Sequence, residues 1–414
     1  MIHDRSPAFT LNVLGVGVML ALLGDATLYI VLPTHTGDAG IALANVGLML
    51  SANRLIRLAL NGPAGVLVDR LPRRAILLPA MLIGATSTLL YLPGGFWPML
   101  LGRLMWGIAW VGIWIGGSAV ALDLAVDANR GRIVGRLQMW FFIAVGVCSV
   151  SGGLLTDIFS YDGAFAVAAA CGFVGFGLWA LLLPETSEAR SSDADPSPQA
   201  SLPVTRWKLD RSALVAMLVL GLNWLAFISI VSAVLPLLLE DRAGEVVRIA
   251  GRPVAISTLT GMLVAANMVV SLFAAPLAGS LSDRARNRWG LVAVSLVVGQ
   301  LALMLIAAGG LPFVIVATML AAAASSVVQT QVYTLVGDAA GRDRRALGLL
   351  STVSDAGAAA GPLLAYSVLL PMAGLDGAFA ILLLLTLPAL PVVVWAAGRE
   401  LALARLATHD PQLP

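Results

Sequence analysis

Long apolar runs separated by short polar segments recur along the whole chain. Each run has about 20 residues, the length that a helix needs to cross the hydrocarbon core of a bilayer. None alternates apolar and polar residues with the period of two that a membrane-spanning β-strand shows. The pattern therefore predicts an all-α integral membrane protein with twelve transmembrane helices, over 9–33, 44–66, 75–92, 98–122, 137–158, 163–184, 211–238, 255–280, 289–308, 312–336, 347–370 and 375–398.

The longest polar stretch divides these helices into two groups of six. It covers residues 185–210 and is rich in serine, proline and aspartate, as flexible linkers are. We therefore expect an N-terminal six-helix bundle, a linker, a C-terminal six-helix bundle and a tail, over 1–184, 185–210, 211–398 and 399–414.

The two groups are copies of one repeat. Sliding the chain by 214 residues places Asn53 on Asn267 and the pentapeptide 162–166 on an identical pentapeptide at 376–380. The same offset aligns Asp69 and Arg70 with Asp283 and Arg284. Two parallel six-helix repeats predict pseudo-two-fold symmetry about the membrane normal.

Basic residues indicate how the helices are oriented. Most lysines and arginines lie at the termini, in the linker and in alternate loops, whereas the opposite side carries Arg242, Arg248 and Arg252. Because loops rich in basic residues stay in the cytoplasm, both termini and the linker are predicted to be cytoplasmic.

Composition excludes several classes of protein. The chain is 59% hydrophobic and only 12% charged, whereas a soluble protein carries about 25% charged residues, so a soluble enzyme is excluded. The net charge of +2 suggests no nucleic-acid partner. The sequence has no metal-ligand cluster and no phosphate-binding glycine loop, so we expect neither a metal, nor a cofactor, nor direct use of ATP.

The loop after the second predicted helix carries a distinctive motif. It reads Gly65-Val-Leu-Val-Asp69-Arg70-Leu-Pro-Arg73-Arg74, and a degenerate copy runs from Gly279 to Arg288. With this motif the chain resembles the major facilitator superfamily over nearly its whole length; Pro72 stands where the family usually has glycine. The resemblance implies a secondary transporter, usually monomeric, in a bacterial inner membrane.

In the family, this loop latches the cytoplasmic face, which makes its residues gate candidates. An alternative is that its arginines only set the topology. Gly65 is expected to let two helices approach closely. Pro184-Glu185, at the end of the sixth helix, is also family-like and indicates little beyond topology. The gate and motif candidates are Gly65, Asp69, Arg70, Arg73, Arg74, Asp123, Arg130, Gly279, Asp283 and Arg284.

Two further motifs bear on ion coupling. Arg103 to Gly107 resembles the Arg-x-x-x-Gly motif that proton-coupled members place near the coupling site. The antiporter motif of the fifth helix is poorly matched, since Ala144, Cys148 and Ser149 replace two of its glycines and its proline. That departure weakens the case for export by antiport.

Four charged residues lie inside predicted spans of the first repeat, and their counterparts in the second carry no charge. They are Asp25, Arg54, Arg57 and Arg103. A charge at mid-membrane costs about 2.5–3.5 kcal/mol on insertion scales, so these residues are expected to pair or to line a wet cavity.

The depths of these residues allow one ion pair. Asp25 and Arg103 both fall in the outer halves of their helices, which line the central cavity in the family. Asp25 is the candidate proton-coupling residue, and a static ion pair is the alternative. Arg54 and Arg57 are candidates for binding an anionic group, because guanidinium forks match carboxylate and phosphate. A packing role is the alternative for both.

We expect proton-driven efflux of a small organic or amphipathic compound by alternating access. The alternatives are uptake of an organic anion, by proton symport or facilitated diffusion, and a transport-inactive sensor or scaffold. The expected partners are a small-molecule substrate, protons and membrane lipid. Polar residues that could line the cavity are Tyr29, Asn223, Trp224, Gln300, Gln329 and Gln331.

Overall fold

The structure is a computed structural model of the 414-residue chain. It describes residues 6–126, 129–187, 211–249, 251–285, 287–340 and 344–409. Most of the predicted linker therefore lies outside the described residues.

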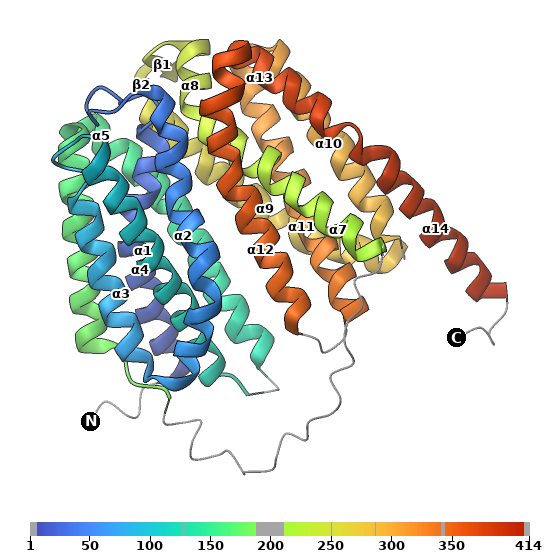
Figure 1. Ribbon diagram of the computed structural model, residues 1–414, viewed down its shortest axis with the longest axis horizontal. Helices are drawn as coiled ribbons and strands as arrows, with labels where there is room; N and C mark the ends of the chain where they lie inside the picture. Colours follow the sequence, from blue (N-terminus) through green and yellow to red (C-terminus); the bar gives the residue numbers. More distant parts are fainter. Residues whose placement is uncertain are drawn as a thin grey trace. The chain divides into compact units, whose positions relative to one another are not determined.

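The first half of the chain is built almost entirely of long helices (Figure 1). The first begins with a defined cap, because the Ser6 hydroxyl accepts a hydrogen bond from the N–H of Phe9 and Pro7 occupies the first helical position. The helices are α1 (Pro7–Val31), α2 (Leu43–Arg70), α3 (Arg73–Leu89), α4 (Phe96–Asp123) and α5 (Arg130–Leu182).

The second half adds two π-helices and a β-hairpin to its long helices. Strands β1 and β2 pair antiparallel, with Val246 opposite Ala255. The elements are α7 (Arg211–Asn223), η1 (Trp224–Ile230), α8 (Val231–Ala243), β1 (Val246–Ile249), β2 (Arg252–Ala255), α9 (Ile256–Ala285), α10 (Arg288–Ala308), α11 (Leu311–Ala340), α12 (Arg344–Leu364), η2 (Ala365–Leu369), α13 (Leu370–Thr386) and α14 (Ala389–His409). Helix α14 thus continues through residues that the sequence assigned to a tail.

The described residues contain the predicted spans. Nine helical stretches are long and apolar enough to cross a membrane. Two of the nine are each divided by a non-helical residue, Ser160 in α5 and Gly374 in α13, which gives eleven. The shorter α3, with 17 residues, is the twelfth. The prediction of a twelve-helix membrane fold is confirmed.

The two dividing residues reveal the internal repeat in the backbone itself. Ser160 has φ 68° and ψ 176°, and Gly374 has φ 66° and ψ −170°. Their numbers differ by 374 − 160 = 214, the offset found in the sequence. Glycine adopts this conformation freely, whereas serine is strained in it. The same turn therefore precedes the last helix of each repeat, with the strain confined to the first copy.

We expect Ser160→Gly to stabilise the protein. Relief of the strained backbone, less the entropy lost by glycine on folding, predicts a gain of about 1–2 kcal/mol in the free energy of unfolding. The matched change in the second copy, Gly374→Ala, is expected to cost about 1–3 kcal/mol. Unfolding of both variants in detergent, followed by circular dichroism, measures the difference. A less stable Ser160→Gly variant would contradict the assigned strain.

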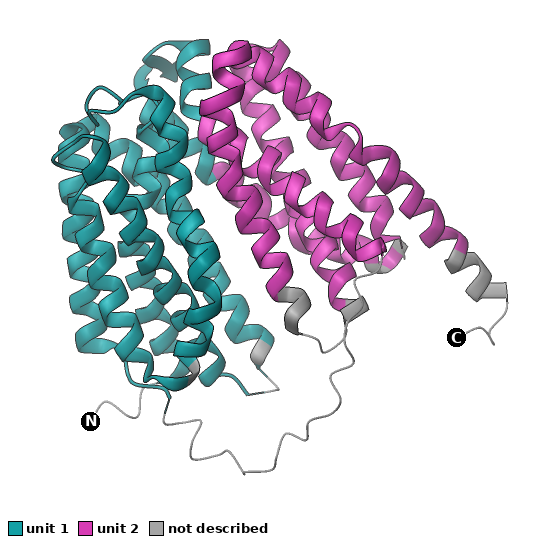
Figure 2. Cartoon of the chain, viewed as in Figure 1, with its two compact units in different colours: residues 1–200, 235–265 teal, residues 201–234, 266–414 magenta. Residues whose placement is uncertain are grey.

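The chain packs into two compact units that do not coincide with the sequence halves (Figure 2). Unit 1 comprises 1–200 and 235–265, and unit 2 comprises 201–234 and 266–414. Glycines explain why the start of α9 belongs to unit 1. A Cβ on Gly153 of α5 would overlap the backbone of Ser257, and one on Gly261 would overlap that of Ser149. Only glycine allows these two backbones to touch.

Tryptophans are among the largest side chains in the mainly aliphatic core of unit 1. Trp179 is fully buried, and its indole N–H donates to the carbonyl of Val13 at 3.1 Å. Trp106 and Trp110 of α4 are also buried, with ring centroids 5.8 Å apart, and Trp110 stacks on Trp114 at 5.7 Å. Trp106, Trp110 and Trp114 thus mainly pack against other side chains, and this packing holds α4 inside the bundle.

Candidate functional site

Asp25 of α1 and Arg103 of α4 form an ion pair inside unit 1. Nη1 of Arg103 lies 2.5 Å from Oδ1 of Asp25, and Nε of Arg103 donates to the carbonyl of Met49 in α2 at 2.7 Å. The Arg103 side chain is fully buried, whereas that of Asp25 is 16% exposed. The pairing that the sequence allowed is therefore present, and its carboxylate remains partly accessible.

Local sequence explains why Arg103 reaches α2. Gly107 lies one turn further along α4, and a Cβ there would be 2.6 Å from the carbonyl oxygen of Asn53. The missing side chain lets α2 and α4 approach closely at this level. Met49 is one turn from Asn53, so the close contact brings its carbonyl to Arg103. The Arg-x-x-x-Gly spacing thus places the arginine one turn from the tightest point of the helix pair.

Tyrosines surround the ion pair. The Arg103 guanidinium lies 5.4 Å from the ring centroid of Tyr29, whose hydroxyl donates to the Leu50 carbonyl at 2.8 Å. Tyr91, two residues beyond the end of α3, is buried and is an electrostatic neighbour of both Arg103 and Asp25. Sequence reasoning missed Tyr91. Its position as a tyrosine at the end of an apolar run was the available signal.

The other two charges of the first repeat lie elsewhere on α2. Arg54 and Arg57 are half-buried and lie five and eight residues beyond Met49, toward the Arg70 end of the helix. Their role in binding an anionic group stays a prediction.

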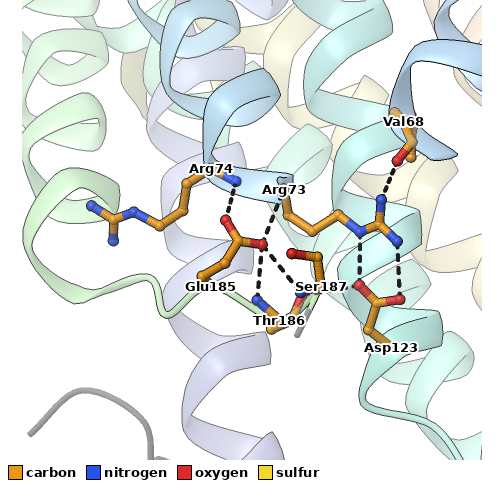
Figure 3. Close-up of polar contacts among 7 residues, drawn as sticks. All are labelled: Val68, Arg73, Arg74, Asp123, Glu185, Thr186 and Ser187. Atoms are coloured by element: carbon orange, nitrogen blue, oxygen red, sulfur yellow. Dashed lines mark hydrogen bonds and ion pairs between the residues drawn. The ribbon is translucent and has the colours of Figure 1, made fainter. Parts of the chain in front are cut away.

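A second polar cluster lies at the opposite end of unit 1 (Figure 3). Arg73, at the start of α3, forms a two-point ion pair with Asp123 at the end of α4, with Nε–Oδ2 and Nη2–Oδ1 distances of 2.7 and 3.2 Å. Its remaining Nη1 donates to the carbonyl of Val68. Both side chains are buried, with 5% and 1% exposed. A buried pair of this geometry fixes α4 against the loop between α2 and α3.

Glu185 completes this cluster from the end of α5. Its carboxylate accepts the backbone N–H groups of Arg73 at 2.8 Å and Arg74 at 3.0 Å, the first two residues of α3 (Figure 3). Burial acts to raise the pKa of Glu185, but the N–H bonds from Arg74, Ser187 and Arg73 outweigh it and hold the pKa below the usual glutamate range. The expectation that Glu185 indicates little beyond topology was wrong, because it caps a helix N-terminus.

The remaining gate candidates differ in how they are placed. Nη2 of Arg74 donates to the Ala180 carbonyl at 2.7 Å, whereas Arg70 and Arg284 are exposed. The expected close approach at Gly65 is not found among the described residues of unit 1, and its role in the gate stays a prediction. A Cβ there would meet no atom within 4 Å, and Gly279 is equally open. The side chains of Asp69, Arg130 and Asp283 lie outside the described part of the structure.

Polar residues of the second half mostly bridge helices. Asn223 is buried and donates to the Ser325 hydroxyl at 3.0 Å, immediately before the π-helix that begins at Trp224. Gln300 donates to the Thr386 carbonyl at 3.3 Å, and Gln331 to that of Ala278 at 3.1 Å. Gln329 is half-buried. Whether these residues line a substrate cavity stays a prediction.

The family model of the Major Facilitator Superfamily matches residues 14–260 and 255–410, nearly the whole chain. The chain is a member of the major facilitator superfamily. Together with the long apolar helices, this membership makes it a multi-pass membrane protein.

Curated relatives of this major facilitator protein include a quinolone resistance protein and an inner membrane transport protein. Quinolone resistance protein NorA of Staphylococcus aureus is 22% identical over 220 residues, 52% of this chain and 55% of NorA. The inner membrane transport protein YajR of Escherichia coli is 25% identical over 180 residues, 42% of this chain and 38% of YajR. The chain thus spans about half or less of the length of the curated relatives it matches.

Solved structures of major facilitator proteins share the fold over almost the full length. A bacterial homologue of the human lysosomal transporter Spinster, inward-facing and occupied, has a TM-score of 0.71 at 17% identity, covering 97% of this chain and 98% of that one. The nucleoside transporter NupG, as a D323A mutant, has a TM-score of 0.74 at 12% identity, covering 95% and 100%. At such identities these likenesses establish the fold alone.

Proposed function

We propose that the protein exports a small organic or amphipathic compound in exchange for protons, with Asp25 as the coupling carboxylate. The ion pair between Asp25 and Arg103 carries this proposal. A partly accessible acid against a fully buried guanidinium is an arrangement that can gain and lose a proton within a membrane. The similarity to NorA, a quinolone resistance protein, supports export as the direction and a drug-like compound as the class of substrate.

The geometry indicates how a proton could alter the site. When Asp25 is ionised, Arg103 holds it through Nη1. Protonation removes the negative partner and frees that N–H for another acceptor. Nη2 of Arg103 is also buried and has no hydrogen-bond partner among the described residues. A buried donor without a partner is costly, so the guanidinium is suited to receive an oxygen of a substrate or a water molecule.

Competition between a proton and a substrate would follow from this arrangement. A proton on Asp25 and an acceptor group on Arg103 each replace part of the same ion pair. Alternating access would expose the pair to the two sides of the membrane in turn, so that binding on one side favours release on the other. A static ion pair, the alternative, would hold α1 to α4 and take no part in coupling.

Transport in proteoliposomes with an imposed pH gradient tests the proposal. Compounds are first selected by growth protection of cells that express the chain. Wild-type protein should then move a protective compound opposite to the proton gradient. Asp25→Asn, which keeps an oxygen acceptor for Arg103, should abolish gradient-driven transport while leaving exchange without a gradient. Asp241→Asn, at an exposed aspartate near the end of α8 whose ion-pair partner Arg242 lies next to it in the chain, serves as the matched control.

Three results would overturn the proposal. Movement of the compound with the protons would indicate symport. Gradient-driven transport by Asp25→Asn at the wild-type rate would reject Asp25 as the coupling group and favour the static ion pair. Absence of any protected compound and of any transport would favour the sensor or scaffold.

A further inference from the structure

A third polar cluster joins α1 to the first segment of α5. Oδ1 of Asn12 accepts hydrogen bonds from Nη2 of Arg136 at 2.9 Å and from the indole N–H of Trp140 at 3.3 Å. All three side chains are half-buried. The cluster belongs to unit 1 and is separate in sequence from both clusters described above.

The sequence builds this cluster by helical spacing and one glycine. Arg136 and Trp140 are four residues apart on α5, and Asn12 and Gly15 are three apart on α1, so each pair shares a helix face. A Cβ on Gly15 would overlap the indole ring of Trp140. The glycine therefore lets the indole lie flat against α1, where its N–H reaches Asn12.

The hydrogen bonds already made leave the cluster with donors only. An amide oxygen has two lone pairs, and both of those on Asn12 are occupied, so Asn12 can offer only its N–H₂ group. The guanidinium of Arg136 has no acceptor, and the single N–H of Trp140 is used. Any further ligand must supply hydrogen-bond acceptors.

The positive charge of Arg136 also indicates a ligand that carries a negative charge. Among the described residues, Arg103 and Arg73 each face an aspartate, whereas Arg136 contacts only a neutral amide. Arg136 lies six residues, or about 9 Å, inside the start of α5. Arg136 precedes the predicted span 137–158, and a half-buried guanidinium bonded to a neutral amide keeps N–H groups that can bind an anion. The other arginine on this part of α5 with a described side chain, Arg132, is exposed.

We propose that Arg136 and Asn12 bind an oxyanion, a phosphate or carboxylate group, with Trp140 fixing the orientation of the amide. The planar fork of Arg136 and the N–H₂ of Asn12 together match an anion that presents two or more oxygens. The group can come from the head group of an anionic lipid or from a soluble compound. The site does not depend on proton coupling at Asp25.

Thermal unfolding of the full-length protein in a neutral detergent tests the site. One arm adds phosphatidylglycerol, with phosphatidylcholine as its control. The other adds sodium phosphate or sodium benzoate, with sodium chloride at equal ionic strength as its control. Wild-type protein should be stabilised in at least one arm. A response to phosphatidylglycerol alone identifies a lipid head group, and a response to phosphate or benzoate identifies a soluble oxyanion.

Variants separate the site from general charge effects. Arg136→Gln should weaken the apparent affinity by at least about tenfold, because it removes a charge-assisted interaction. Arg136→Lys keeps the charge but loses the planar guanidinium, so its apparent affinity should lie between those of wild type and Arg136→Gln. Arg132→Gln should behave as wild type.

Asn12→Asp provides a second test of the site in case Arg136→Gln folds poorly. It should fold at least as well as wild type, because it places a carboxylate of nearly the same shape against Arg136, and it should lose the response to oxyanions. Equal stabilisation of wild type, Arg136→Gln and Asn12→Asp, or no stabilisation of wild type in either arm, would overturn the proposal.

Discussion

Replacing Asp25 by leucine is expected to lower the free energy of unfolding by about 3–5 kcal/mol, because it leaves a buried charge without its partner. The Arg103 guanidinium is fully buried and its only negative contact among the described residues is the Asp25 carboxylate. Unfolding of the purified variant in detergent measures the loss. Asp38→Leu, at an exposed position of the loop after α1, is the matched control and should change stability little.

A double variant separates the ion pair from the packing around it. Asp25→Leu with Arg103→Leu removes both charges and should recover much of the stability that Asp25→Leu loses, since apolar replacements of buried pairs are often neutral or stabilising. If the double variant is as unstable as the sum of its two single variants, the two side chains do not depend on each other. That result would contradict the pairing in the structure.

The second large effect is expected at Arg73. Arg73→Met should cost about 3–5 kcal/mol, because Asp123 is 1% exposed and would keep only the Thr186 hydroxyl as a described side-chain partner. The loss should be concentrated at the end of unit 1 where α3 begins. Hydrogen exchange across residues 68–75 and 120–126 should accelerate relative to wild type, while exchange in the middle of α4 changes little.

Two further variants check this assignment. Arg73→Met with Asp123→Leu should be more stable than Arg73→Met alone, as for the first pair. Arg248→Gln, in the exposed β1 strand, controls for the loss of one positive charge and should leave both stability and exchange unchanged. Uniform acceleration of exchange throughout unit 1 would show that Arg73 supports the whole bundle rather than one end.

The sequence predicted the spans well because hydrocarbon imposes a strong rule on length and polarity. It predicted the contact between Asp25 and Arg103 for a related reason. A charge inside a span is costly, so few arrangements of two opposite charges at similar depth are acceptable. The offset of 214 residues was equally visible, and the matching turns at Ser160 and Gly374 show that it extends to the backbone.

Other features were hidden by the composition of the spans. A helix that is apolar on every side gives no sign of which face meets which neighbour, so the tyrosines around Arg103 and the contact of Asn12 with Arg136 could not be derived. Glu185 was overlooked because its partners are backbone N–H groups, which every sequence contains. The β-hairpin was within reach, since the β-branched run Val246–Ile249 is followed closely by Gly251, a residue that favours a turn.

The cap on α3 also has a consequence for biogenesis. The backbone N–H groups of Arg73 and Arg74 donate to the Glu185 carboxylate, which lies 112 and 111 residues further along the chain. The first two residues of α3 can therefore obtain this partner only after the sixth helix has been synthesised. Once Ser187 has left the ribosome, every described residue of this cluster is available within one continuous segment. The N-terminal repeat can thus form this cluster during translation, before synthesis of the second repeat is complete.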